Sequence, residues 1–123
     1  MVIQVKTRYL FRGKRIGRGW ITGTLADPET IAKNADRSDL YFVDPTTIGQ
    51  CTCLRDKNGD LIFEGDIVKN HVRDQIYRIT YCQIALCIRA DIIGSSRFEN
   101  LWSLDSDDIE IIGNVFDNPE LNK

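Results

Sequence analysis

The fold of this chain is decided by one stretch, Thr52-Cys53-Leu54-Arg55-Asp56-Lys57-Asn58-Gly59-Asp60-Leu61-Ile62-Phe63-Glu64-Gly65-Asp66-Ile67-Val68. Its Asp56-Lys57-Asn58-Gly59 segment predicts a hairpin loop, because Asn and Gly accept the positive φ angles that such loops require. An apolar run follows, and Glu64-Gly65 then leads into a further apolar segment. The stretch therefore predicts a strand, a tight turn, a strand, a second turn and a third strand.

Further short apolar segments follow this stretch and are separated by polar turns. We expect strands over residues 75–82, 84–89, 100–104 and 109–113. In residues 84–89, alternate positions are apolar, which is typical of a strand with one buried face. Residues 51–116 are therefore expected to form a small, SH3-like, partly open barrel.

The first half of the chain shows the same pattern less regularly. Strands are expected over residues 5–12, 20–25, 40–43 and 47–54, with a glycine-rich turn over residues 13–19. Asp27-Pro28 resembles a helix N-cap followed by proline at the first helical position, which predicts at most a short helix through Asn34. The expected fold class is mainly β, a single domain over residues 1–123 with an N-terminal hairpin and helix subdomain over residues 1–50.

Length and composition are those of a globular domain. The chain has 123 residues, of which 42% are hydrophobic and 28% charged. A domain of this size buries enough surface to fold without disulfides or metals. No apolar run reaches the length that spans a bilayer, and the N-terminus does not resemble a signal peptide. We expect a protein that stays in the cytoplasm of the cell that makes it, without membrane contact and with four reduced cysteines.

The cysteines and acidic residues do not predict a metal site. Cys51 and Cys53 are too close together, and Cys82 and Cys87 too far apart, for the usual paired spacing of zinc ligands. Asp56, Asn58 and Asp60 have the spacing of the first three ligands of a calcium loop. The glycine and glutamate that such a loop needs are replaced by leucine and isoleucine, so a hairpin explains these residues better.

Catalytic and cofactor motifs are not found either. The only histidine, His71, lies in a polar turn without a recognisable nucleophile or acid partner. We expect Glu64 and Asp66 to cap backbone N–H groups around a turn at Gly65 rather than to act as an acid–base pair. The glycines of residues 13–19 fit neither a phosphate loop nor a dinucleotide fingerprint. The chain is therefore expected to be no enzyme, to hold no cofactor and to bind no small molecule.

Three segments carry a family resemblance. They are residues 52–68, the opening pair of segments at residues 9–15 and 20–23, and the closing segment at residues 110–121. In this order they resemble the YopX family of small phage and prophage proteins. Two departures are Cys53, where the family tends to have glycine, and residues 27–39, which have no clear counterpart.

The resemblance implies a mainly β domain of phage or prophage origin and supplies no biochemical activity. We expect its motif residues to be structural: Gly59, Phe63, Glu64, Gly65, Asp66, Gly113, Asn114, Asn118 and Pro119.

Charge is distributed unevenly along the chain. The first acidic residue is Asp27, and it is preceded by Lys6, Arg8, Arg12, Lys14, Arg15 and Arg18; beyond residue 98 the acidic residues are Glu99, Asp105, Asp107, Asp108, Glu110, Asp117 and Glu120. Three interpretations are open. The two ends pair within the fold or are solvated, they join subunits head to tail, or the basic hairpin binds nucleic acid. Contacts to nucleic acid or to another subunit would involve Arg12, Lys14, Arg15, Arg18 and Trp20.

These observations favour a non-enzymatic phage or prophage accessory protein that self-associates or binds another protein. The alternative is a nucleic-acid-binding module that uses the basic N-terminal hairpin. An increase in salt concentration distinguishes the two hypotheses, because it would release a protein partner in the first case and a nucleic acid in the second.

Overall fold

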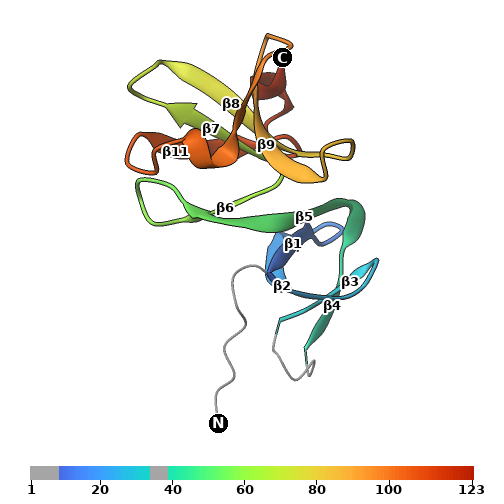
Figure 1. The fold of residues 1–123 in the computed structure, drawn as a ribbon. Coiled ribbons are helices and arrows are strands. Elements are labelled where there is room, and N and C mark those ends of the chain that lie inside the picture. Colours follow the sequence, from blue (N-terminus) through green and yellow to red (C-terminus); the bar gives the residue numbers. More distant parts are fainter. Residues whose placement is uncertain (1–8, 34–38) are drawn as a thin grey trace. The chain divides into compact units, whose positions relative to one another are not determined.

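The computed structural model describes residues 9–33 and 39–123. The chain divides into two compact units, Met1–Cys53 and Leu54–Lys123, and each unit is described here by itself (Figure 1). The start of the strand expected over residues 5–12, with Lys6 and Arg8, lies outside the described residues. So do residues 34–38.

The first unit is built from antiparallel strands. Their bounds are β1 Phe11–Lys14, β2 Trp20–Asp27, β3 Thr30–Ala32, β4 Leu40–Phe42 and β5 Asp44–Arg55. They lie in the order β4-β3-β2-β1-β5, and β6 (Leu61–Phe63) of the second unit follows β5 along the chain through the hairpin loop. Gly23 allows β2 and β3 to approach, since a Cβ there would overlap the carbonyl group of Ala32.

The short helix expected after Pro28 is not formed, and this prediction is wrong. The Asp27 carboxylate accepts a hydrogen bond from the Glu29 N–H at 2.8 Å, which makes a turn between two strands rather than a helix cap. Residues Thr30–Ala32 are buried and pair with β2 on one side and β4 on the other. A helix of so few residues gains little from its own hydrogen bonds, so sheet pairing prevails.

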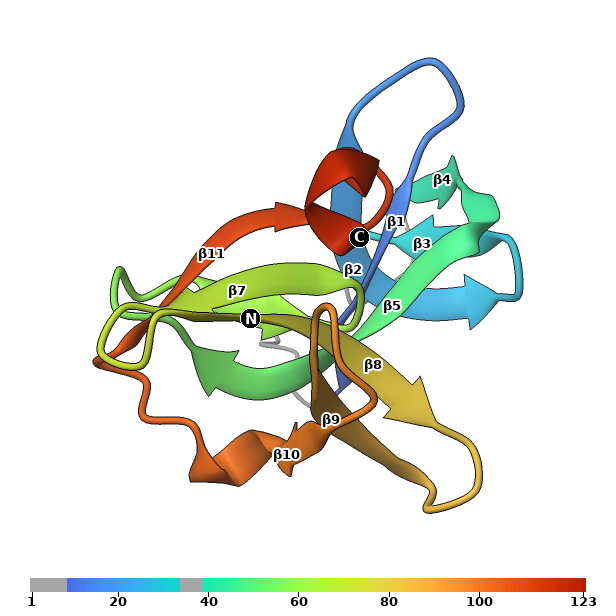
Figure 2. The same ribbon diagram turned by 90° about the horizontal axis from the view of Figure 1, so that it is seen from above.

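The second unit contains a five-stranded antiparallel sheet in the order β10-β9-β8-β7-β11 (Figure 2). Its strands are β7 Asp66–Asn70, β8 Gln75–Cys82, β9 Cys87–Ile92, β10 Phe98–Asn100 and β11 Ile109–Asn114. The two 3₁₀ helices are η2 (Leu101–Ser103) and η3 (Pro119–Asn122). The mainly β class is confirmed, and the sheets are not closed into a barrel.

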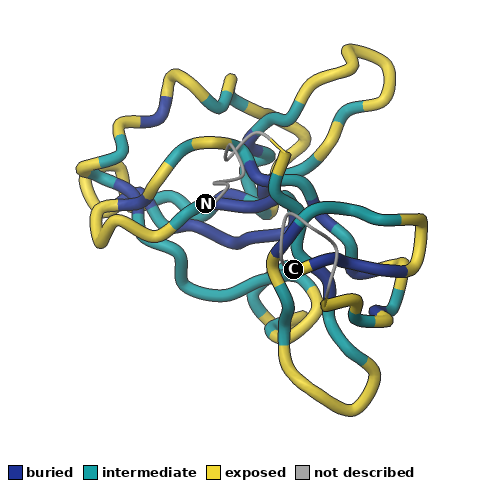
Figure 3. Tube along the Cα trace, turned by 90° about the horizontal axis from the view of Figure 1, so that it is seen from below, coloured by how far each residue is buried: buried dark blue, intermediate teal, exposed yellow. Residues whose placement is uncertain are grey.

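The core of the second unit lies on one face of this sheet. Alternate residues in the middle of β8, Tyr77 and Ile79, are buried, as expected for a strand with one face turned inward, and the exposed positions gather at the turns (Figure 3). The buried cluster consists of Ile62, Val68, Tyr77, Ile79, Ala90, Leu104 and Ile109. Full burial of such side chains contributes about 1.5–3 kcal/mol each to folding.

Two strand predictions in this unit are displaced. The strand expected over residues 84–89 begins only at Cys87, because Leu86 has a φ of 53° and closes a turn with Gln83 to Ala85. Residues 100–104 are mainly the 3₁₀ helix η2. Its turn is closed by the Ser103 hydroxyl, which donates to the Asn100 carbonyl oxygen at 2.6 Å.

Candidate functional site

The basic hairpin of the first unit joins β1 to β2. The Arg15 N–H donates to the Gly19 carbonyl oxygen at 3.2 Å, and the Arg18 N–H donates to the Arg15 carbonyl oxygen at 3.1 Å. Gly17 has a φ of 70°, which glycine adopts without strain. The turn therefore exposes Ile16 and Arg18 to solvent.

Two of the residues expected to contact a partner pack against each other instead. The Arg12 guanidinium lies 4.8 Å from the centroid of the Trp20 ring, in cation–π geometry. The Nε and Nη2 atoms of Arg12 are buried. These nitrogens are closed to a phosphate in this arrangement, so Arg12 and Trp20 hold β1 against β2.

Arg15 connects the hairpin to β4. Its guanidinium lies 5.3 Å from the centroid of the Tyr41 ring, and its Nε donates to the Gly19 carbonyl oxygen at 3.5 Å. The Lys14 N–H donates to the Thr47 hydroxyl at 2.8 Å, which fixes the hairpin to β5 as well. Of the four cationic side chains expected to bind a partner, Arg18 is the exposed one.

A shallow hollow of about 250 Å³ lies beside the hairpin and is lined by Lys14, Arg15, Ile16, Gly17, Asp44 and Thr47. Pockets that enclose a small organic ligand usually have volumes of about 300–1,000 Å³. The hollow is smaller than that.

The sequence analysis missed the outer edge of β4, which ends the sheet of the first unit. Two backbone hydrogen bonds flank β4 and join it to the β3 side. The Lys33 N–H donates to the Asp39 carbonyl oxygen at 2.9 Å, and the Val43 N–H donates to the Glu29 carbonyl oxygen at 3.0 Å. Alternate residues of an antiparallel strand bond to the same neighbour. Leu40 and Phe42 therefore direct their backbone N–H and C=O groups away from β3.

The side chains at this edge are apolar and exposed. Leu40 is 56% exposed and Phe42 is 79% exposed, while Tyr41 between them is half-buried under Arg15. No described strand pairs with this edge. An exposed edge with apolar side chains is a ready template for another strand. The alternation in residues 40–43 predicted a strand, but nothing in it revealed an edge position.

Asp56 holds the hairpin loop that contains the motif residue Gly59. Asp56 is buried, and its Oδ1 accepts the N–H groups of Asn58 and Asp60 at 2.9 and 3.0 Å. Its Oδ2 accepts the Ile111 N–H at 3.0 Å, which ties the hairpin to β11. Gly59 supplies the positive φ, at 85°. The hairpin interpretation of this loop is confirmed.

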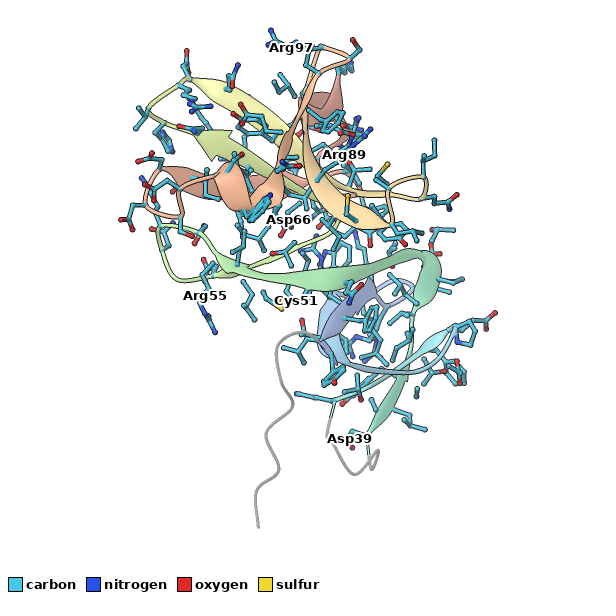
Figure 4. The ribbon with its side chains drawn as sticks, viewed as in Figure 1. Asp39, Cys51, Arg55, Asp66, Arg89 and Arg97 are labelled. Carbon is cyan, nitrogen blue, oxygen red and sulfur yellow. The ribbon has the colours of Figure 1, made fainter. Side chains whose placement is uncertain are left out.

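The turn at Gly65 was also predicted. Gly65 has a φ of 94°, its N–H donates to the Ile79 carbonyl oxygen, and its own carbonyl oxygen accepts the Val115 N–H. Asp66, labelled in Figure 4, is buried, and its carboxylate accepts the Phe63 N–H at 2.7 Å. Capping by this acid is confirmed. For Glu64 the capping role stays a prediction.

The closing motif residues form an interlocked turn. The Asn114 side-chain oxygen accepts the N–H groups of Phe116 and Asp117 at 3.0 and 2.9 Å. The Asn118 side-chain oxygen accepts the Asn114 N–H, and a Cβ at Gly113 would overlap this amide group. Pro119 then begins η3. Glycine is therefore required at residue 113 because a larger side chain would overlap the Asn118 side chain.

Several acidic residues of the C-terminal segment have partners inside their own unit. Glu110 accepts hydrogen bonds from His71 at 3.0 Å and from Asn58 at 3.3 Å, and these contacts lower the pKa of its carboxyl group. Glu99 pairs with Arg73 at 3.0 Å. Part of this negative charge is thus neutralised within the second unit, by residues outside the basic N-terminal segment.

Two absences within residues 9–33 and 39–123 bear on the class of site. No three His, Cys, Asp or Glu side chains are grouped there so that they could hold a metal ion. No helix in this part of the chain is long and apolar enough to cross a membrane.

The chain matches a known protein family. The family model described as YopX protein matches residues 8–123, nearly the whole chain. A search of curated proteins found no match. The family match extends over both units and includes the motif residues that close the hairpins of the second unit. The chain therefore belongs to the YopX family.

Proposed function

We propose that this chain is a non-enzymatic accessory protein of phages or prophages, in the host cytoplasm, that acts by binding protein and in the first place a second copy of itself. The observation that carries the proposal is the outer edge of β4, with outward backbone groups and exposed apolar side chains at Leu40 and Phe42. Strand addition at such an edge gains hydrogen bonds and apolar contact together.

The β4 edge is complementary to itself. Two copies related by a two-fold axis through Tyr41 would place Leu40 of one copy opposite Phe42 of the other. These are the residues whose N–H and C=O groups point outward, so each pair exchanges two hydrogen bonds. An aromatic and an aliphatic side chain then meet across the strands, a pairing that adds about 0.2–1 kcal/mol. The symmetry closes the assembly at a dimer.

The strength of this contact is limited by its length. β4 has three residues, so the shared edge is short. Interfaces below about 1,200 Å² in total are typical of weak, transient complexes. We therefore expect a dimer that forms at high protein concentration and dissociates on dilution.

Light-scattering mass on a sizing column, over a range of loading concentrations, tests the proposal. Wild type should shift from monomer to dimer as the concentration rises, and Phe42→Lys should remain monomeric, because an edge lysine blocks strand addition. Trp102→Lys is the matched control. Trp102 is 84% exposed and lies in the second unit outside any strand, so this variant should dimerise like wild type.

Salt separates the β4 contact from a head-to-tail contact of charged surfaces. The β4 dimer should persist at high salt, since apolar contact and backbone hydrogen bonds are little screened. A multimer that high salt dissolves and that Phe42→Lys leaves intact would overturn the β4 assignment in favour of charge pairing. A wild type that is monomeric at all concentrations would remove self-association altogether.

The alternative function is nucleic-acid binding by the basic hairpin. It is favoured by the exposure of Arg18 and by the net charge of +3 on Met1–Cys53, which has eight basic and five acidic residues. The absorbance of the same column peaks at 260 and 280 nm tests it. A monomer peak with excess 260 nm absorbance that salt strips away would support this alternative.

A further inference from the structure

We propose that Cys82 and Cys87 form a dithiol site that closes to an intramolecular disulfide by exchange with a small disulfide of the glutathione type. This inference is independent of the proposed function. The two cysteines are direct partners in the register of β8 and β9, at the last pair before the turn. Both are free thiols in the structure.

The pair geometry is compatible with a disulfide. The Ile93 N–H donates to the Ile76 carbonyl oxygen at 3.0 Å, so Ile76 and Ile93 are a hydrogen-bonded pair of β8 and β9. In an antiparallel sheet, every second pair of opposed residues is hydrogen-bonded. Counted from Ile76 and Ile93, Cys82 and Cys87 are therefore a hydrogen-bonded pair too, with Cα atoms about 5.5 Å apart. Disulfides span Cα distances of about 4.4–6.8 Å.

Closure needs a small movement. The Cβ atoms of a hydrogen-bonded pair lie about 5.5 Å apart, whereas a disulfide holds them at about 3.5–4.5 Å. The pair borders a turn of four residues whose tip projects from the sheet (Figure 2), with Ile84 98% exposed. Such a turn can adjust without disturbing the core. A bond formed with this adjustment is strained, and strained disulfides are the readily reduced ones.

The surroundings of the two sulfurs differ. Cys87 is exposed, and Cys82 is half-buried with its Sγ accepting a hydrogen bond from Arg89 Nη1 at 3.6 Å. Arg89, labelled on β9 in Figure 4, is held by Asp91 at 2.8 Å and by the Phe98 ring at 4.2 Å. A fixed cation beside a sulfur is typical of reactive cysteines. Accessibility makes Cys87 the first sulfur to react, and Cys82 the second.

The exchange takes place in two balanced steps. The Cys87 thiolate attacks one sulfur of the small disulfide, forms a mixed disulfide and releases one small thiol. The Cys82 thiolate then attacks the Cys87 sulfur and expels the second small thiol. The two cysteines lose two electrons and two protons, which the small disulfide gains as two thiols.

Tryptic digestion after incubation with oxidised glutathione and alkylation of the remaining thiols tests the site. Cleavage at Arg78 and Arg89 leaves both cysteines in one peptide, residues 79–89. This peptide should lose both alkylation sites, and reduction should restore them. The peptide of residues 38–55, which contains the buried Cys51 and the exposed Cys53, is the control in the same digest and should not close to a disulfide, although Cys53 can take up one glutathionyl group.

Cys82→Ser gives a second measurement. Without the resolving sulfur, Cys87 should retain one glutathionyl group. A wild-type peptide 79–89 that stays fully alkylated, or that carries glutathione on Cys87 without closing, would overturn the proposal. A disulfide between Cys51 and Cys53 that forms to the same extent would show that closure is not specific to Cys82 and Cys87.

Discussion

At Cys53 the backbone has a conformation that glycine adopts more readily. Its φ is 70°, although it lies inside β5, and its N–H donates to the Sγ of Cys51 at 3.4 Å. A side chain with a Cβ pays about 1–2 kcal/mol in this region of φ and ψ. This is one of the two places where the sequence departs from the family resemblance, which implies glycine there. The positive φ explains why glycine would suit this position better than cysteine.

Cys53→Gly is therefore predicted to stabilise the protein. The relief of backbone strain should outweigh the larger entropy of glycine in the unfolded chain, for a net gain of about 1 kcal/mol in the free energy of unfolding. Urea unfolding measures it as a higher midpoint. Cys53→Ser keeps the Cβ and should match wild type. A lower midpoint for the glycine variant would show that the side chain, not the backbone, matters at this position.

Asp56 is the acid on which the first hairpin of the second unit depends. Its carboxylate accepts three backbone hydrogen bonds, from Asn58, Asp60 and Ile111. Buried polar groups that lose their partners destabilise a fold more than the bonds themselves stabilise it. The loop spacing that resembled a calcium site is thus explained by backbone donors.

Asp56→Ala should lower the free energy of unfolding by about 2–4 kcal/mol, since it removes three hydrogen bonds to a charged, buried carboxylate and leaves three partly buried N–H groups without this acceptor. Asp60→Ala is the matched control, because this side chain is exposed in the same loop and its loss should change stability by less than about 0.5 kcal/mol. Chemical denaturation of both variants decides the question. Equal effects would mean that the loop tolerates either loss.

Among the elements, strands with local signals were predicted well. The sequence placed residues 61–63 and 75–82 correctly, because turn residues bound both segments and their apolar pattern is regular. It failed where two sequence signals competed, at residues 30–32. There a proline after an acid resembles a helix start, and pairing with β2 and β4 decides the structure instead.

The candidate site could be predicted only in part. The basic residues of the hairpin are evident from the sequence, but the packing of Arg12 on Trp20 and of Arg15 on Tyr41 depends on contacts between strands. An edge position depends on the order of strands in the sheet. No local pattern around Leu40 encodes that order, so the β4 edge could be found only from the structure.

At the scale of the whole molecule, the two units carry opposite net charge. Leu54–Lys123 has eight basic and thirteen acidic residues, a net charge of −5, against +3 for Met1–Cys53. Two first units that meet at β4 therefore repel each other weakly, and salt should strengthen rather than weaken the dimer. Opposite charge on the units would instead favour head-to-tail assembly, so the sign of the salt effect separates the two modes.

Amide hydrogen exchange of the wild type at low and high protein concentration tests the central claim most directly. The N–H groups of Leu40 and Phe42 point away from β3, so they should exchange fast in the monomer. When nine-tenths of the molecules have associated, exchange at both should slow about tenfold, while Tyr41 should change little. Unchanged exchange at Leu40 and Phe42, in a sample that light scattering shows to be dimeric, would contradict pairing through β4.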